Sequence, residues 1–388
     1  MTSITQPQVL ISDRHIGTTQ WQHAMLQQIG VPVVSATLSN HSHYAPPGML
    51  HTAAWLGHLR KLPRCLIDQQ LQRDQVLCAT SLALCSFPPV RVLELLRLPE
   101  RVRLMVNVGH RIHIHALGWT LGSLTRRFEE LMRNPRLRWA CMSRFDVEYT
   151  RYYCGGAPLP LLDVACLHVP QQLRQGTYAP KNRVVLIGPS HQQGNVPGLA
   201  SIEDLNRLSR KRAQQLGREP FTFSTIRSAY PDGQATAERL ARHPAVVMAP
   251  YSAFSISMVE LYQLNLPTFF PADGLLVDAM HDVKLHPIYQ HRFWAERLDR
   301  QFAERARSLG YPYSPNSLHP DAQRYWLQHM YFNQVRNAQR FDSTISLLQQ
   351  LYAHDLAALS AAMQTENNAL CTQQTQLWRQ QMGIAASQ

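Results

Sequence analysis

Short apolar runs alternate with amphipathic stretches along the first half of the chain. The apolar runs that predict strands cover residues 9–12, 31–35, 75–79, 103–108 and 138–143. Helical patterns lie between them at residues 18–29, which Gly30 ends, and at 123–133, where Leu124, Phe128 and Leu131 share one helix face. Strands that alternate with helices are typical of βα units, so this half predicts a parallel sheet.

A second series of the same kind begins near residue 183. Its predicted strands cover residues 183–189, 221–226, 245–249 and 267–270. Its first helix is predicted over 202–216, with Ser201 and Asp204 placed as a capping box. After Pro320 the chain becomes helical and rich in glutamine, and it ends in a polar tail.

These two series predict an α/β protein with two Rossmann-like, doubly wound domains that face each other across a cleft, followed by a helical C-terminal segment. The stretch 171–182 is poor in apolar residues and contains Gly176 and Pro180, which suits a boundary. We therefore expect an N-terminal domain over 1–178, a second over 179–345, and the helical segment and tail over 346–388. In such sheets ligands bind beyond the carboxyl ends of the strands.

Composition agrees with a globular chain of this size. Of the 388 residues 45% are hydrophobic and 16% charged, and no run of about 18 apolar residues predicts a membrane-spanning helix. The first residues do not resemble a signal peptide, so we expect a cytoplasmic protein, with peripheral membrane contact left open. The seven cysteines show no C-x-x-C spacing, which favours reduced thiols.

The net charge of +12 is carried almost entirely by arginine. Arginine binds phosphate well, so such a surface suits nucleotides, nucleic acid or anionic lipid. A G/C-rich genome would explain the scarcity of lysine better than any ligand does. The arginines are spread throughout the chain, so nucleic acid is not an expected partner.

The most informative stretch is 243–271, which reads as strand, small polar loop, helix and strand. Ser252, Ser255 and Ser257 place hydroxyl and N–H groups at the start of the helix, where the helix dipole favours an anion such as a diphosphate. Glu260 lies in the first turns, where a carboxylate can accept hydrogen bonds from a ribose diol. The alternative for Glu260 is an ordinary exposed helix residue.

This stretch resembles the donor-binding segment of GT-B glycosyltransferases, whose pattern is a strand, a proline-bearing loop, small residues, a helix glutamate and a glycine–hydrophobic–proline turn. The matching positions are Pro250, Ser255, Ser257, Glu260 and the turn Asn265–Leu266–Pro267. Asn265 replaces the usual glycine and tolerates the same left-handed conformation. Many retaining members have a further glutamate where Ser252 stands. A weaker resemblance extends the match over most of residues 183–345.

The resemblance implies which residues meet the substrates. Around the nucleotide-sugar donor it places Ser190, Tyr251, Ser252, Ser255, Ser257, Glu260 and Arg227, the last near the leaving diphosphate. On the acceptor side it places Asp13 and His15, with an imidazole that takes the proton of the acceptor hydroxyl. The plainer alternatives are a histidine that only bonds its turn and an arginine on a solvated loop.

The other histidine clusters carry weaker hypotheses. His110, His113 and His115 cluster after a predicted strand, with His113 and His115 as an alternating H-x-H pair. They could line the acceptor side, bind zinc or simply lie on the surface. The same alternatives apply to His41 and His43. No D-x-D pattern for a metal-dependent transferase stands out, so we expect neither a metal site nor a bound cofactor.

The resemblance implies an enzyme that moves a sugar from a nucleoside diphosphate to a hydroxyl of a glycan or other acceptor without a metal ion. P-loop, G-x-G-x-x-G and G-x-S-x-G motifs are missing, which argues against an ATPase, a nicotinamide oxidoreductase and an α/β hydrolase. The alternatives are a nucleotide-sugar epimerase or phosphorylase of the same architecture, or a basic glycan- or nucleic-acid-binding protein without turnover.

Overall fold

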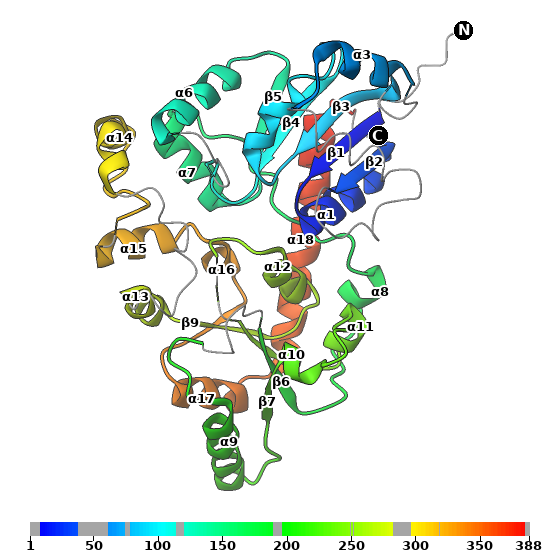
Figure 1. Ribbon diagram of the computed structural model, residues 1–388. Coiled ribbons are helices and arrows are strands. Elements are labelled where there is room, and N and C mark those ends of the chain that lie inside the picture. Colours follow the sequence, from blue (N-terminus) through cyan, green and yellow to red (C-terminus); the bar gives the residue numbers. More distant parts are fainter. Residues whose placement is uncertain are drawn as a thin grey trace. The chain divides into compact units, whose positions relative to one another are not determined.

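The structure is a computed structural model, and it describes residues 8–37, 61–73, 78–113, 120–188, 196–248, 250, 252–281, 296–317 and 319–384. These residues form two compact units (Figure 1). The first unit takes the described residues of 1–168, 294–316 and 372–388, and the second takes those of 169–293 and 317–371.

Each unit contains one five-stranded sheet in which every pairing is parallel. The first sheet has the order β2-β1-β3-β4-β5 and is built from β1 (Gln8–Asp13), β2 (Val33–Thr37), β3 (Thr80–Cys85), β4 (Arg103–Val108) and β5 (Leu137–Cys141). The second has the order β7-β6-β8-β9-β10 and is built from β6 (Val184–Gly188), β7 (Thr222–Thr225), β8 (Val246–Met248), β9 (Thr268–Pro271) and β10 (Gln339–Phe341). Both units therefore repeat one strand order, 2-1-3-4-5, which is that of a Rossmann-like doubly wound sheet.

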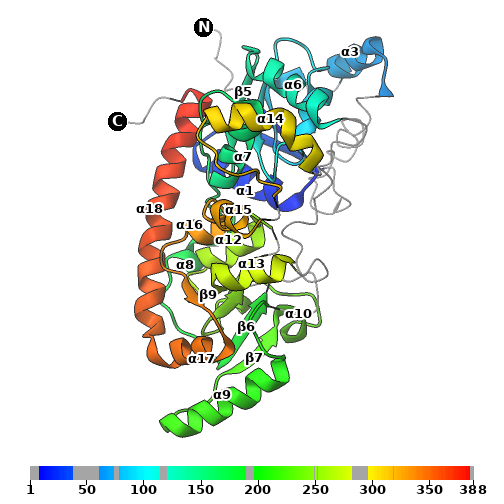
Figure 2. The same ribbon diagram turned by 90° about the vertical axis from the view of Figure 1, so that its left-hand side faces the viewer.

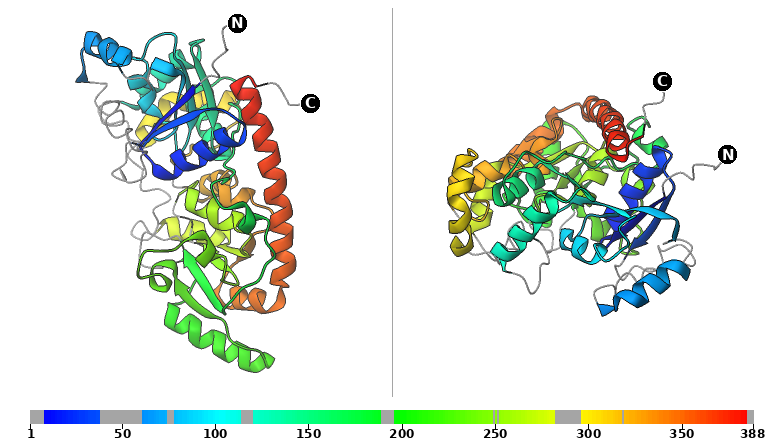
Figure 3. Two further views of the ribbon diagram at one scale, coloured as in Figure 1. Left: turned by 90° about the vertical axis from the view of Figure 1, so that its right-hand side faces the viewer. Right: turned by 90° about the horizontal axis from the view of Figure 1, so that it is seen from above.

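Helices connect the strands in both units. The first unit contains α1 (Ile16–Gln28), α3 (Arg64–Arg73), a 3₁₀ turn (Pro89–Arg91), α5 (Val92–Leu95), α6 (Leu121–Met132), α7 (Arg144–Cys154) and α14 (Glu296–Ser308). The second contains α8 (Gln171–Arg174), α9 (Ile202–Leu216), α10 (Ile226–Ala229), α11 (Ala237–Leu240), α12 (Ile256–Gln263), α13 (Asp273–His281), α15 (Pro320–Leu327), α16 (Tyr331–Gln334) and α17 (Thr344–Ala353). The long helix α18 (Leu356–Met382) gives its first turns to the second unit and its last turns to the first (Figure 3).

Two late segments of the chain complete the first unit. Trp378 of α18 is fully buried and packs edge-on against Trp21 of α1, with ring centroids 5.6 Å apart. Helix α14 packs on α6 and α7, where Arg305 Nη1 lies 2.8 Å from a carboxylate oxygen of Glu129. The first unit is thus closed by residues that lie far from its sheet in the sequence.

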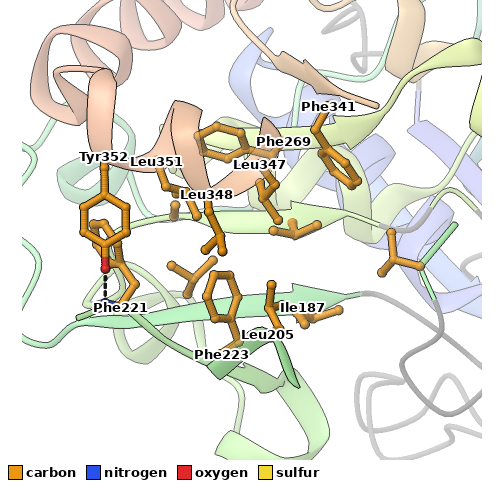
Figure 4. Packing of buried hydrophobic residues seen from close by; sticks show 14 of the residues in the cluster. Ile187, Leu205, Phe221, Phe223, Phe269, Phe341, Leu347, Leu348, Leu351 and Tyr352 are labelled. Carbon is orange, nitrogen blue, oxygen red and sulfur yellow. Dashed lines mark hydrogen bonds between the residues drawn. The ribbon is translucent and has the colours of Figure 1, made fainter. Parts of the chain in front are cut away.

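The core of the second unit lies between its sheet and helices α9 and α17, which lie side by side (Figures 1 and 2). Phe221, Phe223 and Phe269 from the sheet side pack against Leu205 of α9 and Tyr352 of α17 (Figure 4). The Tyr352 hydroxyl accepts a hydrogen bond from the Phe221 N–H at 3.0 Å. This contact satisfies both polar groups inside an otherwise apolar cluster.

The periodicity predicted most of these elements. Strand β4 and helix α9 have the predicted bounds, and the Ser201 hydroxyl accepts the Asp204 N–H at 3.1 Å, which confirms the serine half of the predicted capping box. The Asp204 carboxylate instead accepts the Ser201 hydroxyl at 2.9 Å. One strand was misplaced, because the third strand is Thr80–Cys85. Of the predicted run 75–79, residues 75–77 lie outside the described residues and 78–79 are helical. The short edge strand β10 was missed, because the region around it was assigned to helix.

The division of the chain also differs from the expected ranges. The first crossing between units comes after residue 168, ten residues before the expected boundary at 178. Residues 294–316 and 372–388 belong to the first unit, although the linear pattern assigned them to the second domain and to a separate helical segment. Their packing on α1, α6 and α7 is the physical reason.

Two further features concern the helices and the cysteines. Among the described residues no helix combines the length and apolar character needed to span a bilayer. No disulfide joins the cysteines in the described part of the chain, and four of them, Cys85, Cys141, Cys154 and Cys166, are buried.

Candidate functional site

In a sheet of order 2-1-3-4-5, the chain turns in opposite directions after its first and third strands, which opens a crevice at their carboxyl ends. We call this place the switch point of the unit. It lies between β1 and β3 in the first unit and between β6 and β8 in the second. The predicted site residues can be located relative to these two points.

Asp13 is the last residue of β1 and is fully buried at the switch point of the first unit. Its carboxylate accepts hydrogen bonds from three backbone N–H groups, those of His15 at 3.2 Å, Ser86 at 3.1 Å and Phe87 at 3.2 Å. Burial raises its pKa to about 6, against the lowering effect of these hydrogen bonds. The carboxylate therefore ties the loop after β1 to the loop after β3.

His15 is the N-cap residue of α1 and is exposed. Its carbonyl accepts the Thr18 hydroxyl at 2.7 Å, and its ring packs edge-on against Phe87 with centroids 5.8 Å apart. The ring of His110 packs edge-on against the same Phe87 at 5.4 Å. Because these residues follow β1, β3 and β4, three rings gather at the carboxyl edge of the first sheet.

The turn after β4 has an unusual backbone. His110 and Arg111 both have positive φ, of 54° and 25°, a region that side chains other than glycine rarely adopt. Asp146 of α7 is buried beside this turn, and burial raises its pKa to about 7 although the Ser143 hydroxyl and the His110 and Arg111 N–H groups lower it. The Arg111 guanidinium is itself buried, 5.7 Å from the centroid of the Tyr149 ring. Sequence reasoning singled out His110 but missed Arg111 and Asp146.

His113 belongs to the core. It is fully buried, and its Nε2 lies 2.9 Å from the Thr125 hydroxyl. Burial lowers its pKa to about 3, so the ring is neutral at physiological pH. His41, His43 and His115 lie outside the described residues. Within the described ranges no three His, Cys, Asp or Glu side chains gather as metal ligands would.

The second unit places four of the predicted donor residues on one loop and helix. Ser252 follows β8 and donates its hydroxyl hydrogen to the Phe254 carbonyl. Ser255 is the buried N-cap residue of α12, and its carbonyl accepts the N–H groups of Met258 and Val259. The structure therefore confirms a helix that begins just beyond the switch point, with serines at its start.

Helix α12 has one polar, less buried stripe. Ser257 and Glu260 are half-buried, whereas every other residue of the helix is buried. They are three residues apart and so lie on one helix face. Asn265 ends the helix with φ 57°, the left-handed conformation expected at this turn. Ser257 and Glu260 are thus the partly exposed side chains of this helix.

The remaining predicted donor residues are not on the described part of the loop and helix that carry Ser252, Ser255 and Glu260. Arg227 is exposed on α10, which follows β7, so β6 lies between it and the switch point. At the end of β6 a Cβ on Gly188 would lie 2.5 Å from the Ile226 side chain, so α10 approaches this strand closely. Ser190 and Tyr251 lie outside the described residues.

Comparison with known proteins gives few relatives. No protein-family model and no curated protein matches the sequence. Among solved structures, the chain is similar to CalG4, the calicheamicin glycosyltransferase, over 99% of this chain and 100% of that one, with 9% identity and a TM-score of 0.39. It is similar to the wall teichoic acid polymerase TagF over 96% and 89%, with 10% identity and a TM-score of 0.39. At such values the fold class rests on the strand order of this chain itself, which defines a protein of two Rossmann-like units.

Proposed function

We propose that the protein is a glycosyltransferase that moves a sugar from a nucleoside diphosphate to a hydroxyl of a glycan or other acceptor, without a metal ion. The observation that carries the proposal is the start of α12 beyond the β6–β8 switch point, with Ser257 and Glu260 on its accessible stripe. Two Rossmann-like units, each with its own switch point, suit a reaction of two substrates.

On the donor side, the start of α12 would hold the diphosphate. The first N–H groups of a helix point along its axis and carry the positive end of its dipole, which favours an anion. Glu260 lies one turn further along the same face as Ser257, where its carboxylate would accept hydrogen bonds from the ribose hydroxyls. Arg227, Ser190 and Tyr251 remain proposed contacts of the same donor.

On the acceptor side, His15 would be the general base. Its exposed ring follows β1, and a neutral imidazole can accept a proton from a hydroxyl. The acceptor hydroxyl would give its proton to this ring while its oxygen bonds to the sugar and the bond from the sugar to the diphosphate breaks. Asp13 would position His15, since its carboxylate accepts the His15 N–H.

Binding of nucleoside diphosphates and their sugars tests the donor site. We expect one nucleotide to raise the melting temperature of the wild type and to do so far less in Glu260→Ala. At 100 times its dissociation constant a ligand stabilises the protein by about 2.7 kcal/mol, a readily measured shift. Glu219→Ala, which removes an exposed carboxylate elsewhere in the second unit, is the matched control and should behave as wild type.

Turnover separates the proposal from its alternatives. With the nucleotide identified, release of the nucleoside diphosphate should depend on an added acceptor and should be lost in His15→Ala. Conversion of the donor without any acceptor would instead indicate an epimerase. Binding without turnover, or no nucleotide binding at all, would favour a binding protein and leave Glu260 an ordinary helix residue.

A further inference from the structure

The second unit has a separate concave site on its surface, with a volume of about 400 Å³. Its polar lining comes from Asn182, Ser224, Tyr230, Arg239, Arg242 and His243. Asn182 precedes β6 and His243 precedes β8, so the pocket lies toward the amino ends of these strands. The loops of the proposed donor site leave from the opposite, carboxyl ends. Ser224 of β7, Ala229 of α10 and Tyr230 also line the pocket, and no residue of α12 does. The pocket therefore does not include the start of α12, which carries the proposed donor site.

The lining is cationic. Arg239 and Arg242 contribute two guanidinium groups, and none of the described residues that line the pocket has a carboxylate. The nearby carboxylate of Asp232 accepts a hydrogen bond from Arg239 Nη1 at 2.7 Å, and the same guanidinium lies over the Tyr230 ring at 4.5 Å. Arg242 is exposed, and its charge acts on the Tyr230 hydroxyl, whose pKa it lowers against the larger raising effect of burial. The pocket thus presents positive charge next to a buried phenol.

A hydrogen-bond chain beside the arginines can accommodate a charged imidazole, although the Arg239 carbonyl also accepts the Arg242 N–H at 3.3 Å. His243 Nδ1 lies 2.8 Å from the Val184 carbonyl oxygen and must donate to it. His243 Nε2 lies 2.6 Å from the Tyr230 hydroxyl, which lies 2.9 Å from the Arg239 carbonyl oxygen. A tyrosine hydroxyl has one hydrogen, so with a neutral ring it can serve either Nε2 or the carbonyl, not both. The imidazolium satisfies all three contacts, because Nε2–H then donates to the hydroxyl.

That charged form lacks a counter-charge. His243 is buried, and burial lowers its pKa, which disfavours the imidazolium. The charged and titratable groups around it are Tyr230, Arg239 and Arg242, with Asp232 already paired to Arg239. An anion in the pocket would supply the missing negative charge and would be held by the arginines.

We propose that this pocket binds the oxyanion group of a small molecule, of the phosphate or sulfate type, together with the protonated form of His243. Arg242 would be the main contact, because it is exposed at the pocket. The proposal is independent of the glycosyltransferase assignment, since it uses neither switch point. A ligand in this pocket would bind the second unit near the amino ends of β6 and β8, whereas the loop that leads to α12 leaves from the carboxyl end of β8.

Sulfate is the probe of choice, because its own charge does not change between pH 5 and pH 8. Sulfate binding is measured by NMR titration of the histidine ring signals, with the His243 signal assigned by its loss in His243→Gln. We expect sulfate to raise the pKa of His243 and to bind more weakly as the pH rises above that pKa. Arg242→Ala should weaken binding about tenfold, the effect of one charge-assisted hydrogen bond.

Two controls keep the result specific. Arg210→Ala, which removes an exposed arginine on α9, and Glu260→Ala at the proposed donor site should both bind sulfate as the wild type does. Equal binding by Arg242→Ala and wild type, or a His243 signal that ignores sulfate, would overturn the proposal. Loss of sulfate binding in Glu260→Ala alone would also overturn it, because the anion would then lie at α12.

Discussion

At Asn265, in the turn after α12, the contribution of side-chain hydrogen bonds to stability can be measured separately from that of the left-handed backbone. Asn265 is buried and has φ 57°. Its side-chain amide donates to the Arg174 carbonyl at 2.8 Å and accepts from Asn367 Nδ2 at 2.8 Å. The Ser360 hydroxyl donates to its backbone carbonyl at 2.7 Å. The residue therefore connects the end of α12 with α8 and α18.

Replacement by glycine and by alanine should destabilise the second unit to different extents. Asn265→Gly keeps the left-handed backbone but loses two side-chain hydrogen bonds, each worth about 1 kcal/mol. The Arg174 carbonyl keeps Gln364 and Asn367 keeps the Tyr262 carbonyl, so neither partner is left unbonded and we expect a loss of about 2 kcal/mol. Asn265→Ala loses the same two hydrogen bonds and also places alanine in the left-handed region, which costs about 1–2 kcal/mol more. The lower entropy of its unfolded chain offsets part of this cost, so we expect a total loss of unfolding free energy of about 3 kcal/mol.

The order of stability of the wild type and the two variants can be measured within the second unit by a denaturant titration in which hydrogen exchange is the readout. Peptides that cover 256–271 and 356–371 report on both sides of the contact. We expect protection to fall from wild type to Asn265→Gly and again to Asn265→Ala. A glycine variant as stable as the wild type would show that the side-chain bonds contribute nothing. Equal stability of the glycine and alanine variants would refute the role of the left-handed backbone.

Two further predictions concern the first unit. Trp378→Ala should lower its free energy of unfolding by about 3–5 kcal/mol, because it empties a fully buried space beside Trp21, whereas the exposed-site control Gln380→Ala should cost little in the same denaturant titration. For Asp13, burial raises the pKa from the ordinary 3.8 to about 6, so its contribution to stability is full below pH 3.8 and is lost as the pH rises through 6. Relative to Asp13→Asn, the wild type should therefore lose about 3 kcal/mol of unfolding free energy between pH 3 and pH 7, and a difference that ignores pH would contradict this assignment.

The sequence predicted elements whose pattern is local and strong. Strand β4 is a continuous apolar run with one asparagine, and α9 has a serine cap, a helical period and a terminal Gly217 in the left-handed conformation. Strand β3 was misplaced because its residues Thr80 and Ser81 weaken the apolar signal. Strand β10 has only three residues, two of them polar, and is fixed by its pairing with β9, which no local pattern encodes.

The candidate sites were predictable to a similar extent. Their position follows from βα order alone, because each site begins where a strand ends, and the start of α12 was anticipated from its serines. The turn at His110 and Arg111 could not be anticipated. Its positive φ values occur beside Asp146, a buried residue of α7 that follows the next strand. Nor does the sequence reveal that Asp13 is buried under three amide groups, because the partners at 86 and 87 are distant in the chain.

The path of α18 has a consequence for synthesis of the protein on the ribosome. The second unit is made of segments that all precede Thr372, so it can reach its final packing while the chain is still being extended. All strands of the first unit's sheet are synthesised before residue 142, yet Trp21 can pack against Trp378 only after Trp378 has left the ribosome. The unit that is translated first is therefore the unit that is completed last. Its apolar surface around α1 stays uncovered while more than two hundred further residues are translated, at about 5–20 residues per second.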